Sequence, residues 1–218
     1  MPREAFEHSI EELNARITAM GAATVDALQK AMFAFRERDL DSAKKIKKAD
    51  VLIDMQQLEI EDLVATTMAT QQPVAKDLRL LLCAIQMASD LERSADYAAH
   101  LAKATKFFVQ DPQWRQTAML EQMASIGASM ITDTVNAFIG RDALLARQTS
   151  LMDDQIDHLH KTVIKEMVLL LGTRPDDAEK VTKFIQVSGY LERLGDHMTN
   201  ACESILYMVE GVHAELNP

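Results

Sequence analysis

The chain contains two copies of one amphipathic helix pattern, and this internal repeat restricts its fold more than any other feature. Residues 184–203 read FIQVSGYLERLGDHMTNACE, with no proline and with apolar residues every three or four positions, as on one face of an α-helix. One hundred positions earlier, AIQMASDLERSAD repeats the pattern, and Leu91-Glu92-Arg93 matches Leu191-Glu192-Arg193. A repeat of this length predicts two similar halves that pack together.

The composition indicates an all-α protein. Seven glycines, five prolines and 5% aromatic residues in 218 positions favour long helices over sheets. The apolar periodicity predicts six long helices. Short connections imply antiparallel neighbours, so we expect two tandem, pseudo-symmetric three-helix bundles. The expected helices cover residues 3–38, 41–71, 74–108, 114–139, 143–171 and 175–210, approximately.

Turn signals separate these segments. Asp111-Pro112 is the clearest boundary and divides the chain into expected units of residues 1–110 and 111–218. Gly21 weakens the middle of the first helix by up to about 1 kcal/mol relative to alanine. The other expected breaks are Gln71-Gln72-Pro73, the turn Gly140-Arg141-Asp142, a C-terminal cap at Gly172, a helix start at Pro175, and Gly211 after the last helix.

Charge and hydropathy exclude some functions. The net charge of −10 and the pI of about 5.1 argue against nucleic-acid binding, which needs clustered lysine and arginine. The N-terminus lacks the apolar core of a signal peptide, and no apolar run is long enough to span a bilayer. We therefore expect a cytoplasmic protein without membrane insertion. Cys83 and Cys202 have no metal or redox spacing and are expected to be buried free thiols.

Pairs of acidic residues four positions apart are the strongest functional signal. Such residues are neighbours on a helix and repel each other by roughly 0.2–0.5 kcal/mol, more when buried. Each half carries one pair on its second helix and one on its third, so adjacent helices would gather four carboxylates. Oxygen ligands of this kind suit Mg²⁺, Mn²⁺, Ca²⁺ or Fe. The alternative is a solvated face paired with Lys or Arg. The expected metal ligands are Asp50, Asp54, Glu92 and Asp96 in one half and Asp153, Asp157, Glu192 and Asp196 in the other, with His100 and Asn200 as possible extra ligands.

The remaining polar residues carry weaker signals. His158 and His160 are expected at the surface, and His197 is placed to support a ligand. Glu210 and His213 form the chain's one Glu-x-x-His motif, whereas a ferritin-like di-iron site needs two, and no catalytic motif is present, so an enzyme is disfavoured. The basic run Lys44, Lys45, Lys47 and Lys48 is expected to be solvated, with docking to an acidic partner or a membrane surface as the alternative.

Two long segments closely resemble the PhoU family of phosphate-signalling regulators. They are QQPVAKDLRLLLCAIQMASDLERSADYAAHLAKA at residues 71–104 and GYLERLGDHMTNACESILYMVEG at residues 189–211. The resemblance covers nearly the whole chain. It implies two PhoU-type three-helix repeats and multinuclear metal sites at the four acidic pairs. The family's glycine is kept in Leu194-Gly195 but is replaced in Ser94-Ala95, which puts close helix approach at the first site in question and allows the two sites to differ in affinity or metal.

The resemblance also implies a function. The chain would be a non-enzymatic cytoplasmic adaptor between a phosphate ABC transporter ATPase and a sensor histidine kinase, and a negative regulator when phosphate is plentiful. It would form a homodimer and bind divalent or trivalent metal ions, with Fe, Mn, Mg and Zn as candidates. It would meet membranes only peripherally, through its partners. The alternatives are a metal-dependent enzyme or metal-storage protein that uses the carboxylate clusters, and a paralogue that serves another transporter.

Overall fold

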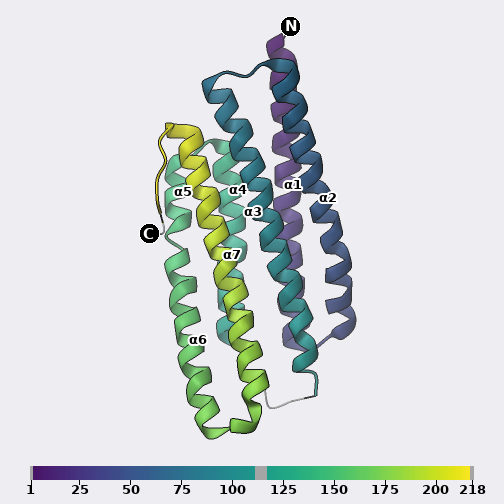
Figure 1. Ribbon diagram of the computed structural model, residues 1–218, viewed down its shortest axis with the longest axis vertical. Coiled ribbons are helices and arrows are strands. Elements are labelled where there is room, and N and C mark those ends of the chain that lie inside the picture. Colours follow the sequence, from purple (N-terminus) through teal and green to yellow (C-terminus); the bar gives the residue numbers. More distant parts are fainter. Residues whose placement is uncertain (1, 111–116, 217–218) are drawn as a thin grey trace.

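The computed structural model describes residues 2–110 and 117–216, which form two antiparallel three-helix bundles side by side (Figure 1). The first bundle consists of α1 (Pro2–Glu37), α2 (Leu40–Gln71) and α3 (Ala75–Ala104), and the short 3₁₀ helix η1 (Thr105–Phe107) follows α3. The predicted all-α fold of tandem bundles is therefore confirmed. The predicted boundary at Asp111-Pro112 and the first residues of the fourth predicted helix lie outside the described residues.

The second bundle contains one more helix than predicted. It consists of α4 (Ala118–Gly140), α5 (Ala143–Ser150), α6 (Asp153–Thr173), the 3₁₀ helix η2 (Pro175–Asp177) and α7 (Ala178–Glu210). The prediction of one continuous helix over 143–171 was wrong, because the chain turns at Leu151 and Met152. Acidic residues are favoured at a helix N-terminus, where Asp153 and Asp154 now lie in the first turn of α6.

The same kind of turn precedes α2 in the first bundle and α5 in the second. Arg38 and Arg141 both adopt left-handed conformations, with φ of 59° and 51°. The next residue in each case is an aspartate that caps the following helix: Asp39 accepts hydrogen bonds from two backbone amides of α2, and Asp142 does so for α5. The turn at residues 140–142 is thus confirmed.

A continuous core joins the bundles, because α1 packs against α4 and α3 packs against α7. Gly21 lies where α1 packs against α4, and a Cβ added there would be only 2.6 Å from Val135 Cγ2. Phe35, Phe108 and Phe184 contact one another at the same junction of the halves. The glycine that weakens α1 locally therefore permits close packing between the halves.

The apolar residues that recur every three or four positions are mostly buried, including Leu13, Ile17 and Met20 on α1 and Leu191 and Met198 on α7. Cys83 and Cys202 are buried free thiols, as predicted. The predicted cap at Gly172 was wrong, because α6 continues to Thr173, whereas Gly211 does end α7 in a left-handed conformation. None of the helices in the described residues is both long and apolar enough to cross a membrane.

Candidate functional site

The first acidic cluster lies where α2 packs against α3. Asp50 and Asp54 project from α2, and Glu92 and Asp96 project from α3. Burial raises the pKa of Asp50 to about 6, and the negative charges of Asp96 and Asp54 add to the rise. Burial also raises the pKa of Glu92, with a further contribution from Asp96. The structure thus brings the four predicted carboxylates of this half into one electrostatic cluster.

The second acidic cluster lies where α6 packs against α7. Burial raises the pKa of Asp153 to about 7, and the charges of Asp196, Asp157 and Glu192 raise it further. The pKa values of Glu192 and Asp196 are also raised, first by burial and then by their acidic neighbours. The predicted pseudo-symmetry therefore extends to the two clusters.

A glycine makes the second cluster tighter than the first. Gly195 leaves space for the carboxylate of Asp153, since a Cβ at position 195 would overlap Asp153 Oδ1 and lie 3.3 Å from Ile156 Cδ1. The residue that corresponds to Gly195 in the first half is Ala95. Asp50, which corresponds to Asp153, is half-buried, whereas Asp153 is 5% exposed. The replacement of the family's glycine by Ala95 in the first half therefore coincides with a more open first cluster.

Basic side chains balance part of the acidic charge. Arg93 lies 3.5 Å from a carboxylate oxygen of Glu92 and 3.3 Å from one of Asp96. Lys161 pairs with Asp157 at 2.8 Å in the second cluster. The alternative that the acidic residues pair with Lys or Arg therefore holds in part. The pKa of Glu92 nevertheless stays raised, because burial and the acidic neighbours together outweigh the effect of Arg93.

The donor chemistry of both clusters fits a hard cation, since each offers four carboxylates on two packed helices. The recess at Gly195, which a Cβ would fill, gives the second cluster a preformed position for one of these carboxylates. Within the described part of the chain, no three His, Cys, Asp or Glu side chains converge closely enough to hold an ion as they stand. Metal binding would therefore require the repelling carboxylates to move inward.

The predicted accessory ligands lie in different environments. His100 and Asn200 are exposed, and His100 is close enough to Asp50 to lower the pKa of that carboxyl in part. His158 is exposed, as predicted. The surface prediction for His160 was wrong, because it is half-buried between α6 and α7 and its Nδ1 lies 2.9 Å from Ser188 Oγ.

A polar and aromatic cluster between the two acidic clusters was missed from the sequence. Asp90 is buried on α3, and its carboxylate lies 2.9 Å from His197 Nδ1 on α7. At the pseudo-equivalent position, Tyr97 stacks on Tyr190 with ring centroids 6.1 Å apart. Tyr190 corresponds to Asp90 in the repeat, and this aromatic counterpart could have indicated that Asp90 faces inward. His197 therefore contacts α3 as well as lying beside Asp196.

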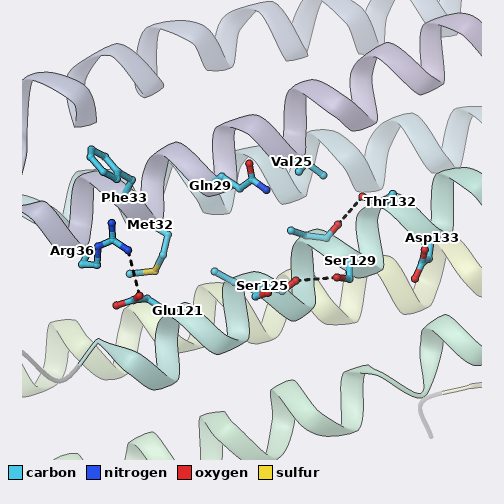
Figure 2. A pocket seen from close by; sticks show the side chains of 12 residues that line it. Val25, Gln29, Met32, Phe33, Arg36, Glu121, Ser125, Ser129, Thr132 and Asp133 are labelled. Atoms are coloured by element: carbon cyan, nitrogen blue, oxygen red, sulfur yellow. Dashed lines mark hydrogen bonds and ion pairs between the residues drawn. The ribbon is translucent and has the colours of Figure 1, made fainter.

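A hollow on another part of the molecule is lined by none of the acidic-cluster residues. This hollow of about 590 Å³ lies between α1 and α4 (Figure 2). Its cation Arg36 lies 3.5 Å from Glu121 and also pairs with Glu37. The hydroxyls of Ser129 and Thr132 donate to carbonyls of their own helix. These side chains do not converge on a common point, so we assign the candidate site to the acidic clusters.

Comparisons with known proteins match nearly the whole chain. The family model described as PhoU domain matches twice, at residues 17–105 and 120–205. A phosphate-specific transport system accessory protein PhoU homolog of Clostridium acetobutylicum is 34% identical over 218 residues and is covered completely, as is this chain. A homolog of the same description from Streptococcus pneumoniae serotype 4 is 30% identical, with 99% of this chain and 100% of that protein covered.

Solved structures show the same architecture. The crystal structure of PhoU from Pseudomonas aeruginosa superposes with a TM-score of 0.89 at 27% identity, covering 95% of this chain and 100% of that chain. The crystal structure of the phosphate transport system regulatory protein PhoU from Streptococcus pneumoniae gives a TM-score of 0.89 at 28% identity, covering 96% and 99%.

Proposed function

Because this chain belongs to the PhoU family, we propose that it is a cytoplasmic accessory regulator of a phosphate transport system. This proposal rests mainly on the end-to-end match to a protein named as an accessory protein of phosphate-specific transport. Since the match covers both chains completely, the proposal concerns the whole of this chain rather than one half.

The proposed mechanism is that of an adaptor. One partner is the ATPase of a phosphate ABC transporter, and the other is a sensor histidine kinase, whose output the protein restrains when phosphate is plentiful. Two bundles joined by one core offer long, rigid helical faces that suit simultaneous contacts with two proteins. This role needs no catalytic group, and we assign none.

Deletion of the gene tests the regulatory role. A phosphate-starvation reporter should be switched on in phosphate-rich medium in the deletion strain, and the intact chain supplied from a plasmid should silence it again. The matched control is the same plasmid carrying an early stop codon. A reporter that stays silent after the deletion contradicts this role and favours a paralogue that serves another transporter.

We further propose that the acidic clusters bind metal ions, with Fe, Mn, Mg and Zn as candidates. The residues that would hold them are Asp50, Asp54, Glu92 and Asp96 in one half and Asp153, Asp157, Glu192 and Asp196 in the other. A bound cation would neutralise the repelling carboxylates and so stabilise the packing of the paired helices. The recess at Gly195 supports tighter binding in the second half.

Manganese binding by the purified full chain tests this assignment. Titration with Mn²⁺, followed by electron paramagnetic resonance, should show a lower stoichiometry for Glu192→Gln/Asp196→Asn than for the parent protein. Gly195→Ala should weaken the tighter sites by about tenfold, because the added methyl displaces Asp153, equivalent to about 1.4 kcal/mol. Gly172→Ala is the control, since nothing lies within 4 Å of its added Cβ.

Unchanged Mn²⁺ stoichiometry in the double variant would contradict the assignment of Glu192 and Asp196. Circular dichroism separates this outcome from unfolding. A screen of the metal-loaded protein for hydrolysis and for redox cycling of bound iron would distinguish the adaptor from the metal-dependent enzyme or storage protein.

A further inference from the structure

A buried hydroxyl orients the ring of His160 beside the second acidic cluster. His160 lies on α6 and is half-buried, and Ser188 of the adjacent helix α7 is fully buried (Figure 1). His160 Nδ1 lies 2.9 Å from Ser188 Oγ, and the hydroxyl of Ser188 donates its hydrogen to the carbonyl of Ile185 at 2.8 Å. Because that hydrogen is already used, Ser188 Oγ accepts a hydrogen bond from Nδ1 of the ring. The proton of neutral His160 is therefore on Nδ1, and Nε2 keeps its lone pair.

The surroundings of His160 favour this neutral ring. Burial lowers the pKa of His160, and although the charge of Asp157 acts in the opposite direction, that of Lys161 acts in the same direction as burial. A histidine with a lowered pKa is mostly uncharged at pH 7. The ring also packs against Gly189 of α7, since a Cβ at that position would be 3.8 Å from His160 Cε1. His160 is thus held as an uncharged nitrogen donor rather than as a cation.

His160 extends the row of acidic residues on α6. It follows Asp157 by three positions and Asp153 by seven, so these side chains lie on one face of the helix. On α7, Ser188 precedes Glu192 by four positions, which is about one helical turn. The charge of Asp157 raises the pKa of both His160 and Glu192, so the three groups are close enough to interact. His160 therefore lies one helical turn beyond the carboxylates of the second cluster.

The first half lacks both members of this pair. The equivalent positions in the repeat are Gln57 on α2 and Ala88 on α3. Gln57 donates a hydrogen bond of 2.8 Å to Glu61 of its own helix. The histidine of the first cluster, His100, lies on α3 and is exposed, with its ring centroid 5.3 Å from that of Tyr190. The two clusters therefore differ in their nitrogen donors as well as in their glycine.

We propose that His160 supplies, through Nε2, a nitrogen ligand to the metal ion of the second cluster and makes that cluster prefer Zn²⁺ and Fe²⁺ to Mg²⁺ and Mn²⁺. Imidazole suits Zn²⁺ and Fe²⁺, whereas carboxylates alone suit Mg²⁺ and Mn²⁺. A metal-binding histidine usually donates its other ring N–H to a nearby acceptor that orients the ring, and Ser188 Oγ is such an acceptor. The inference rests on the metal binding proposed above and adds the residue that selects the metal.

His160 also provides a fixed donor for the rearrangement that metal binding requires. The carboxylates of the cluster must move inward, whereas the ring of His160 is already held by Ser188 and packed against Gly189. Asp157 is one turn away on the same helix, and its present partner is the exposed Lys161 at 2.8 Å. Breaking an exposed pair of this kind costs about 1 kcal/mol or less. Asp157 is therefore available to join His160 at a shared ion.

Zinc binding by the full chain, measured by competition with a chromophoric chelator, tests the proposal. In a Glu92→Gln/Asp96→Asn background, which disables the first cluster, His160→Gln should weaken Zn²⁺ binding by about tenfold or more and change Mn²⁺ binding by less than about threefold. Ser188→Ala removes the acceptor that orients the ring and should weaken Zn²⁺ binding by about tenfold. His158→Gln is the matched control, because His158 is an exposed histidine on the same helix, and it should leave both affinities unchanged.

Imidazole ¹⁵N NMR gives a readout that a purely structural role of His160 would not change. In the metal-free chain the proton of His160 should be found on Nδ1, and stoichiometric Zn²⁺ should shift the Nε2 resonance of His160 but not that of His158. A proton on Nε2, an Nε2 resonance that stays unchanged while Zn²⁺ binds, or equal Zn²⁺ affinity of His160→Gln and the parent overturns this inference alone. A parent chain that binds neither Zn²⁺ nor Mn²⁺ overturns the metal assignment of the acidic clusters as well. Circular dichroism checks that each variant folds.

Discussion

At the scale of single residues, the two acidic clusters differ in one aspartate position. Asp153 begins α6 and is buried in the recess at Gly195, whereas Asp50 lies within α2 and is half-buried. Burial raises the pKa of Asp153 to about 7 and that of Asp50 to about 6. Above pH 7 both carboxylates are charged, so the metal-free fold carries its largest electrostatic cost there.

The sign of the pH dependence follows from these raised pKa values. The folded protein binds a proton at Asp153 more tightly than the unfolded chain does, so the stability of the metal-free fold falls as pH rises from about 4 to about 7. Asp153→Asn removes the charge and keeps the side-chain size. At pH 8 in a chelator, it should raise the free energy of unfolding by about 2 kcal/mol. Near pH 4 the gain should vanish, because the folded parent then carries a protonated, uncharged carboxyl.

Chemical denaturation at the two pH values measures this effect. Asp154→Asn is the control, since its side chain is also in the first turn of α6 but is exposed. It should show no comparable gain at pH 8. A lower stability of Asp153→Asn than of the parent at pH 8 would mean that local contacts of the carboxylate outweigh its burial and repulsion.

At the scale of helices, periodicity was sufficient to predict most of the elements. The helices that correspond to α1, α2, α3, α4 and α7 were predicted, because one face of each is buried against a neighbour and is apolar. The break between α5 and α6 could not be predicted in this way. The residues around it keep helical periodicity, and the first half runs unbroken through the corresponding segment of α2. Asp153, the first residue after the break, lies against Gly195 of a different helix, and local sequence does not report such a contact.

Gly21 illustrates the same limit for helix packing. Its local effect is to weaken α1, but its environment is the close contact with Val135 of α4. Gly21→Ala should therefore destabilise the protein by about 1–2 kcal/mol, because overpacking outweighs the gain in helix propensity. Gly172→Ala meets no atom within 4 Å and should be neutral or stabilising by up to about 1 kcal/mol.

Thermal or chemical unfolding of the two variants provides the comparison. Because both replace a helical glycine by alanine, their difference isolates the contact between α1 and α4. An equal gain in stability for both variants would show that α1 and α4 have room for the methyl group.

At the scale of the whole molecule, the sequence predicted the two halves and the membership of each acidic cluster, because the repeat places equivalent residues on equivalent helices. It did not predict how the halves meet. Asp90 and His197 are 107 residues apart in the chain, and their contact depends on α3 and α7 packing antiparallel. A pattern within one helix cannot show which of its polar residues will face a distant helix.

The contact between α3 and α7 also shows that the two repeats carry different residues at the equivalent positions where they meet. Position 97 of α3 meets position 190 of α7, and position 90 meets position 197, so the same pair of sites occurs twice. One pair consists of two tyrosines, and the other of an aspartate and a histidine. A protein assembled from two first halves would instead place an aspartate against a tyrosine at both positions, with no imidazole for either buried carboxylate. The two halves therefore differ at the residues through which they meet, and a protein made of two first halves would lose the pairing of Asp90 with His197.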